Sequence, residues 1–184
     1  MTQTVAAAGA AAAAGKGLKG AKAAKKTKPK KKNGLADTGS KSGKDSVDDI
    51  VKGVENGDIL LSNNIQKGNY GEMKMDVYFK SQGYERISLD RVTDLNAPTH
   101  QGIDGVYYKS NGHPPYIIGE AKYGSSKQGS TKDGMQMSDT WINGSNRLVN
   151  AVGKDVADDI LLEGYGRILV NITSDGKVII KNLD

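Results

Sequence analysis

The chain has 184 residues, of which 26 are Lys or Arg and 21 are Asp or Glu, and it contains no cysteine. This length suffices for one modest globular domain with extra segments and excludes several large domains within these 184 residues. The lack of cysteine excludes disulfides, thiolate zinc sites, iron–sulfur clusters and a cysteine nucleophile. Any catalysis must therefore use carboxylates, lysines, hydroxyl groups or the two histidines.

The formal net charge of +5 is unevenly distributed along the chain. Residues 1–33 contain nine lysines and no acidic residue, which leaves 17 basic and 21 acidic residues for positions 34–184. The body of the chain therefore has a net charge of −4, and the basic character belongs to the N-terminal segment. A nucleic-acid function of the body must be argued from a site and not from total charge.

Residues 1–45 have the composition of a disordered Ala/Gly/Lys-rich linker or tail. Ala and Gly make up most of Val5–Ala24, and Lys25–Lys32 reads KKTKPKKK, so this segment lacks the apolar side chains of a core. The lysines follow the Ala/Gly run instead of preceding it, which argues against a signal peptide. We expect no stable membrane association, and we favour a linker from a larger delivery protein.

Residues 46–68 are predicted to be a short helical linker before the main domain. Apolar residues recur there at helical spacing behind a potential cap at Ser46: Val47, Ile50, Val51 and Val54. Sequence complexity rises at Asn69. We therefore expect the functional domain to span residues 69–184, within the usual size range of a single core.

Hydrophobic periodicity and turn residues predict the elements of this domain. The expected helices are 71–82, which Gly83 ends, 138–152 and 155–163, and the expected strands are 84–90, 105–109, 116–123, 166–172 and 177–182. The segment 71–82 also alternates as a strand would, and we favour the helix there. The order of elements predicts a mixed α/β (α+β) domain and not a helical bundle.

The hairpin formed by strands 105–109 and 116–123 carries the chemistry. Side chains alternate along a strand, so Glu120 and Lys122 emerge on the same face. Reflection of the hairpin about Gly112 places Asp104 opposite Glu120, to within about one position of register. Two carboxylates and one ammonium group are thus expected to converge at one end of the hairpin.

Two carboxylates held together repel each other unless a cation lies between them. A hard divalent ion such as Mg²⁺ or Mn²⁺ suits this oxygen-rich ligand set. The neighbouring Lys122 can orient an attacking water or stabilise developing negative charge. The pattern therefore indicates metal-dependent hydrolysis of a phosphodiester.

Asp104 in GIDGVYY, with Glu120 and Lys122 in IIGEAKYG, resembles the D…ExK core of the PD-(D/E)XK nuclease superfamily, although Ile103 replaces the usual proline. The resemblance implies a restriction-endonuclease-like core, a mixed central sheet flanked by helices. It also implies that Glu72, on the preceding helix, joins Asp104 and Glu120 as a metal ligand. Gln136, after the ExK strand, is implied as a further member of the catalytic set.

Residues 66–145 are also similar to the C-terminal toxin domains of bacterial polymorphic toxins. This similarity implies a nuclease delivered as part of a larger toxin into the cytoplasm of a competitor bacterium and neutralised by a cognate immunity protein. We expect that partner to be acidic, because basic residues follow the catalytic strand: Lys122, Lys127, Lys132 and Arg147.

Several alternatives stay open. DNA is the favoured substrate, but the same fold hosts RNases, including toxins that cut transfer RNA. A non-catalytic protein that binds nucleic acid through its basic tail is the runner-up class. His100 is interpreted either as a phosphate contact or auxiliary acid, or as an ordinary loop histidine. Asp76, Asp90 and Asp94 are interpreted as surface or turn carboxylates.

Overall fold

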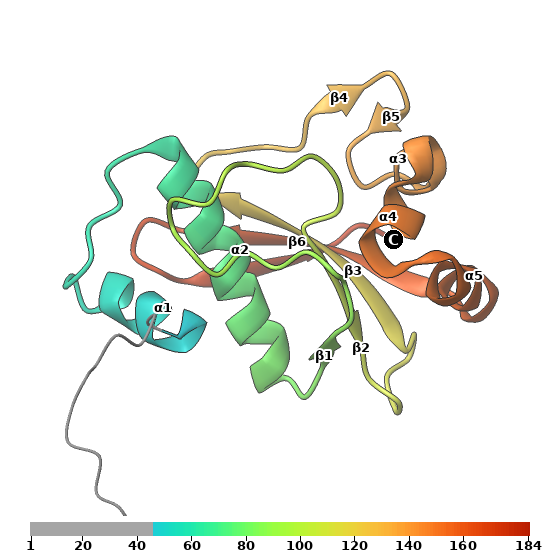
Figure 1. The fold of residues 1–184 in the computed structure, drawn as a ribbon, viewed down its shortest axis with the longest axis horizontal. Helices are drawn as coiled ribbons and strands as arrows, with labels where there is room; N and C mark the ends of the chain where they lie inside the picture. The colour runs from blue at the N-terminus through green and yellow to red at the C-terminus, as the bar shows by residue number, and fades with distance from the viewer. Residues whose placement is uncertain (1–45) are drawn as a thin grey trace, which may run out of the picture. The chain divides into compact units, whose positions relative to one another are not determined.

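The computed structural model of the chain describes residues 46–184, which belong to one compact unit. The predicted tail over residues 1–45 lies outside the described part of the chain. A five-stranded mixed sheet occupies the centre, and helices cover both of its faces (Figure 1). The coarse prediction of a mixed α/β domain is thus confirmed.

The sheet is built in the order β1-β2-β3-β6-β7. These strands are β1 (Glu85–Arg86), β2 (Gly105–Tyr108), β3 (Tyr116–Tyr123), β6 (Tyr165–Ile172) and β7 (Val178–Asn182). Strand β3 runs parallel to β6, and the other neighbouring pairs are antiparallel. A separate small hairpin consists of β4 (Ser130–Thr131) and β5 (Gly134–Met135).

Two groups of helices flank the sheet. Helices α1 (Val47–Glu55) and α2 (Asn64–Ser81) precede it in the chain. The connection from β3 to β6 contains α3 (Asp139–Asn143), a 3₁₀ turn (Gly144–Asn146), α4 (Arg147–Val152) and α5 (Lys154–Glu163). Among residues 46–184, no helix has the length and apolar character needed to cross a membrane.

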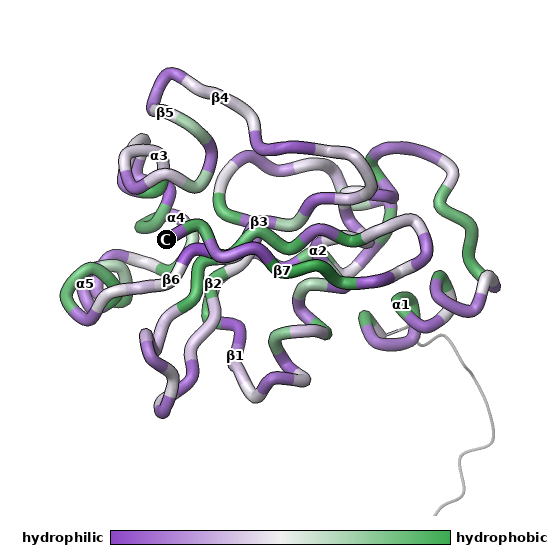
Figure 2. Tube along the Cα trace, turned by 180° about the vertical axis from the view of Figure 1, so that it is seen from behind, coloured by the Kyte–Doolittle hydropathy of each residue, from purple (hydrophilic) through white to green (hydrophobic). Residues whose placement is uncertain are grey.

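Strand β3 is buried on both faces because each face packs against a different helical layer. On one face, Met75 and Phe79 of α2 pack with Val51 of α1 and Ile117 of β3. On the other face, apolar residues of α3–α5 pack around Ile118. In Figure 2 the hydrophobic stretches concentrate along the central strands. Both layers therefore fix the strand that carries the candidate chemistry.

Helix α2 approaches β3 closely because residue 119 is a glycine. A Cβ atom at Gly119 would lie 2.9 Å from Met75 Sδ and 3.3 Å from the Tyr107 ring. A larger residue there would have to push the helix away from the sheet. The glycine therefore sets the distance between α2, which carries Glu72, and the strand that carries Glu120.

The predicted hairpin and its register are confirmed. Gly105 pairs with Gly119 and Tyr108 with Tyr116, and the same register continued by one residue sets Asp104 opposite Glu120. The predicted first helix has its capping box at Ser46 and Asp49.

Other boundaries differ from the prediction. Helix α2 begins at Asn64, seven residues before the expected start at Gly71, and α1 packs into the same core as α2. The segment 46–68, expected to be a linker, is therefore part of the domain that was predicted to begin at residue 69. The strand predicted over 84–90 pairs only at Glu85–Arg86. The helix predicted over 138–152 is broken at Ser145 and Asn146, where φ is positive.

Candidate active site

The predicted site residues line one cavity of about 510 Å³. Helix α2 supplies Glu72, the residue before β2 is Asp104, strand β3 supplies Glu120 and Lys122, and the segment after β5 supplies Gln136. All five come together although Glu72 and Gln136 are 64 positions apart in the chain. The cavity lies where the C-terminal half of β3 emerges from between the helical layers.

Asp104 is held in place by one hydrogen bond to its side chain and one to its backbone carbonyl. Its Oδ2 accepts a hydrogen bond of 2.9 Å from the Ala121 backbone N–H on β3. The Arg86 guanidinium donates to the Asp104 carbonyl oxygen over 2.8 Å. Asp104 thus has a fixed position relative to Glu120 before any ligand binds.

Glu120 is a buried carboxylate, 1% exposed, with one oxygen satisfied and the other not. Its Oε1 accepts hydrogen bonds from Lys122 Nζ at 2.5 Å and from Gln136 Nε2 at 2.6 Å. Its Oε2 is buried and has no hydrogen-bond partner among residues 46–184. A buried carboxylate oxygen without a donor is costly, so Glu120 is an exception to the usual pairing of buried polar groups.

Glu72 and His100 complete one wall of the cavity. His100 Nε2 lies 3.0 Å from Glu72 Oε2. Ligand atoms of Glu72, His100 and Asp104 all lie within 4.8 Å of one another. The structure thus places His100 beside a candidate metal ligand, and the signal in the sequence was its position only four residues before Asp104.

The surroundings of the cavity raise the pKa values of three of its titratable groups. Burial raises the pKa of Asp104 well above its usual range, and the nearby Glu120 and Glu72 carboxylates raise it further. Burial also raises the pKa of Glu120, against the opposing effect of Lys122. The hydrogen bond to Glu72 raises the pKa of His100. Burial is thus the main cause of the raised pKa values of Asp104 and Glu120, and repulsion among the carboxylates adds to it.

The donor set fits a hard divalent cation. Glu72, Asp104 and Glu120 offer carboxylate oxygens to the same cavity, and the Glu120 Oε2 atom lacks a donor. A cation held by Glu72, His100 and Asp104, whose ligand atoms lie within 4.8 Å of one another, would offset the negative charge of the carboxylates in the cavity. The residues present therefore suit the Mg²⁺ or Mn²⁺ that the sequence predicts.

Arg147 and Trp141 form the opposite wall. The Arg147 guanidinium lies 4.6 Å from the centre of the Trp141 ring and donates a 2.8 Å hydrogen bond to Asp133 Oδ2. Trp141 is 3% exposed, in agreement with the expectation that it is a core residue. Arg147, expected to belong to a basic surface, instead lines the cavity in a fixed orientation.

Asp76 was interpreted as a surface or turn carboxylate, and this interpretation is wrong. It is buried on α2, where its oxygens accept hydrogen bonds from Arg86 at 2.6 Å, from Arg91 at 2.9 Å and from the Tyr107 hydroxyl at 2.7 Å. Because Arg86 also binds the Asp104 carbonyl, Asp76 supports the candidate site indirectly. Its position one helical turn after Glu72 was the signal that could have identified it.

Comparisons of the chain with models of protein families, with curated proteins and with solved structures find no match. The functional proposal therefore depends on the chemistry and geometry of the cavity.

Proposed function

We propose that the chain is a divalent-metal-dependent nuclease of the PD-(D/E)XK type with a restriction-endonuclease-like core. The observation that carries the proposal is the buried Glu120, which lines one cavity with Asp104, Glu72 and Lys122 and whose Oε2 has no hydrogen-bond partner among residues 46–184. Nothing in core packing favours such an arrangement, whereas metal-dependent phosphodiester hydrolysis uses it.

The order of elements supports the same proposal. Helix α2 supplies Glu72, the antiparallel β2–β3 hairpin supplies Asp104, Glu120 and Lys122, and helices connect β3 to the parallel strand β6. This is the mixed central sheet flanked by helices that the sequence resemblance implies. The position of Asp104, Glu120 and Lys122 on one hairpin supports the proposal.

The roles of the side chains follow from their positions. Glu72, Asp104 and Glu120 would hold Mg²⁺ or Mn²⁺, which supplies Lewis acidity toward a phosphate oxygen and toward a bound water. Lys122 Nζ lies at the cavity wall, where it can hold the attacking water or donate to a phosphate oxygen. Gln136 fixes the orientation of the Glu120 carboxylate, and His100 fixes Glu72.

The biological setting follows from the resemblance to polymorphic toxins. In this proposal the nuclease is delivered as part of a larger toxin and acts in the cytoplasm of the target cell, preferably on DNA, and an acidic immunity protein neutralises it. Cleavage of RNA, including transfer RNA, remains the alternative substrate class, since the cavity itself does not distinguish the two sugars.

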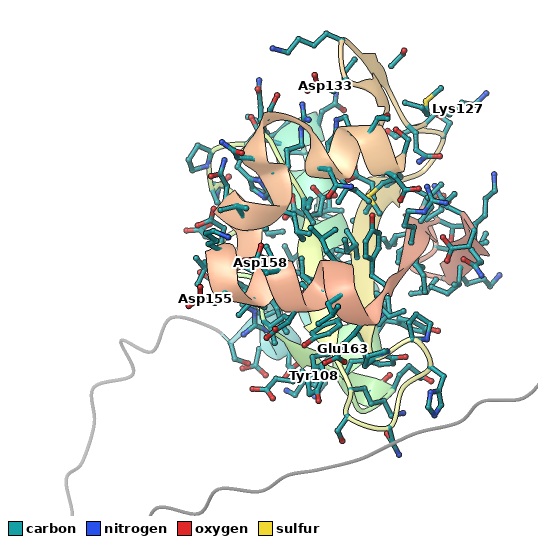
Figure 3. All side chains as sticks on the ribbon, turned by 90° about the vertical axis from the view of Figure 1, so that its right-hand side faces the viewer. Tyr108, Lys127, Asp133, Asp155, Asp158 and Glu163 are labelled. Carbon is teal, nitrogen blue, oxygen red and sulfur yellow. The ribbon has the colours of Figure 1, made fainter. Side chains whose placement is uncertain are left out.

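Incubation of the full chain with plasmid DNA and with total RNA tests the proposal. We expect cleavage of one substrate with Mg²⁺ or Mn²⁺, no cleavage in excess EDTA, and loss of cleavage in Asp104→Asn. The matched control is Asp155→Asn, which makes the same exchange at an exposed position of α5 (Figure 3). Cleavage that persists in EDTA, or equal activity of the two variants, would contradict a metal-dependent site at Asp104.

A further inference from the structure

A second cavity of about 480 Å³ adjoins the candidate active site. It extends from the first turns of α2 to the loop that follows β3, and Gly68, Ala121 and Lys122 line both cavities. The two hollows therefore meet along one line across α2 and β3. Any polymer bound at the candidate active site can continue into the second cavity, which we call the flanking groove.

The flanking groove is positively charged. Its lining contains Lys67, Lys122 and Lys127 and no acidic residue. Lys122 is paired with Glu120, but Lys67 and Lys127 have no carboxylate partner among residues 46–184. Figure 3 shows Lys127 well apart from the acidic residues Asp155, Asp158 and Glu163 of α5. The groove thus offers two uncompensated ammonium groups to an anion.

Gly68 lies where the two cavities meet, and packing does not explain it. A Cβ atom built there has no neighbour within 4 Å, whereas one at Gly71, a turn later in α2, would lie 3.8 Å from Ala121 and Ile172. Glycine inside a helix lowers stability relative to alanine. The glycine therefore leaves open space at the junction of the two cavities.

The loop that borders the groove is held by the sheet. The Gly124 N–H donates to the Ile172 carbonyl over 2.8 Å, and Asn171 Nδ2 donates to the Gly124 carbonyl over 3.0 Å. The Ser126 N–H donates to the Tyr123 carbonyl over 3.2 Å. Since these bonds fix the start of the loop, the groove is formed before a ligand binds.

We propose that the nucleic-acid strand passes from the candidate active site over Gly68 into the flanking groove, where Lys67 and Lys127 bind the backbone phosphate next to the scissile one. The proposal rests on the proposed nuclease function. The ligand is a polynucleotide that extends at least one nucleotide beyond the cleaved bond on the Lys67 side. A phosphate held there fixes the register of the strand at the catalytic carboxylates.

The first test measures binding of a fluorescently labelled single-stranded oligonucleotide by anisotropy, in EDTA and over a series of salt concentrations. The Lys67→Gln, Lys127→Gln double variant should raise the Kd about tenfold or more and lower the salt slope by roughly 0.7, as expected when one backbone phosphate of a single strand is no longer neutralised. The matched control is Lys52→Gln with Lys109→Gln, since neither residue lines the two cavities and the same charge is lost. An equal effect of both double variants would mean that only net charge affects binding. It would contradict the proposed role of the flanking groove.

The second test examines the junction. Gly68→Ala should raise the Tm by about 2 °C, because the helix gains stability where packing needs no glycine. Gly68→Leu should weaken oligonucleotide binding about tenfold, whereas Ser81→Leu, at the exposed end of the same helix, should not. A Tm lowered by Gly68→Ala, or unchanged binding in Gly68→Leu, would contradict the proposed path.

The groove and the nuclease function can fail separately. If binding depends on Lys67 and Lys127 but no metal restores cleavage, the groove stands and the nuclease proposal is wrong. If the wild-type chain cleaves and the Lys67/Lys127 double variant binds as tightly as wild type, the groove is wrong and the nuclease proposal stands.

Discussion

Two buried carboxylates of this domain have opposite surroundings. Asp76 is neutralised by two arginines and a tyrosine hydroxyl, and both of its oxygens have donors. Glu120 has one lysine and one amide on a single oxygen, a bare second oxygen, and further carboxylates beside it. Asp76 is therefore fully paired within the protein, whereas Glu120 has one buried oxygen without a donor among residues 46–184.

The largest expected effect is a loss of cleavage activity without a loss of folding. Glu120→Gln should lower the cleavage rate at least about 100-fold, since it removes a charged ligand from the reacting centre. The variant should stay folded, because the amide oxygen can still accept a hydrogen bond from Lys122. Glu163→Gln on α5 provides the matched control, and the readout is the initial cleavage rate together with circular dichroism. Activity of Glu120→Gln above about a tenth of wild type would exclude Glu120 as a ligand.

The second prediction concerns Asp76. Asp76→Asn should lower the free energy of unfolding by about 3 kcal/mol, because Arg86, 12% exposed, would be left as a buried cation without its carboxylate. Denaturation by urea, monitored by Trp141 fluorescence, measures this loss. A variant as stable as wild type would show that the arginine pair does not need its carboxylate, and the comparison with Glu120 would fail.

The third prediction is that removal of a carboxylate from the candidate site increases stability, the opposite of the effect expected for Asp76. Asp104→Asn should stabilise the metal-free chain at pH 8 by about 1 kcal/mol, since it removes one of the mutually repelling carboxylates. Because the pKa of Asp104 is raised on folding, its contribution to stability is complete below pH 4 and is lost as the pH rises through the raised pKa.

The gain from Asp104→Asn should therefore shrink from pH 8 to pH 5. Urea denaturation in EDTA at the two pH values measures it, with Asp155→Asn as control. Destabilisation by Asp104→Asn at pH 8 would contradict the electrostatic account of the site.

The smallest effect is expected at His100. The pKa of His100 is raised by Glu72, so the pair stabilises the fold below pH 6.5 and this contribution is lost as the pH rises through the raised pKa. His100→Gln should thus cost about 0.5 kcal/mol or less at pH 5.5, since the pair is partly exposed, and nothing at pH 8. A double-mutant cycle with Glu72→Gln measures the coupling, and a coupling that is larger at pH 8 would contradict the assignment.

The hairpin could be predicted from sequence because its signals are local. Alternation along residues 116–123 assigns the two faces of β3, and a symmetric turn around Gly112 fixes the register of Asp104. Local patterns could not identify Glu72 and Gln136, because their contacts with the hairpin depend on tertiary packing. Only the family resemblance pointed to them.

Other features depend on interactions that no short window contains. The first turns of α2 are polar, so periodicity gave no sign that the helix begins at Asn64. The ion pairs of Asp76 with Arg86 and Arg91 join residues 10 and 15 positions apart. The break at Ser145 and Asn146 requires left-handed backbone without a glycine, a conformation that propensity disfavours.

Titration of the metal-free chain with Mn²⁺ tests the central claim most directly. Calorimetry in two buffers of different ionisation enthalpy measures both the stoichiometry and the protons released. We predict one saturable site per chain and proton release that decreases as the pH is raised, because bound metal lowers the raised pKa values of Asp104 and Glu120. The Asp104→Asn, Glu120→Gln double variant should show no such site. Absence of saturable binding in the wild-type chain, or equal binding by the double variant, would contradict the assignment of these carboxylates as a cation site.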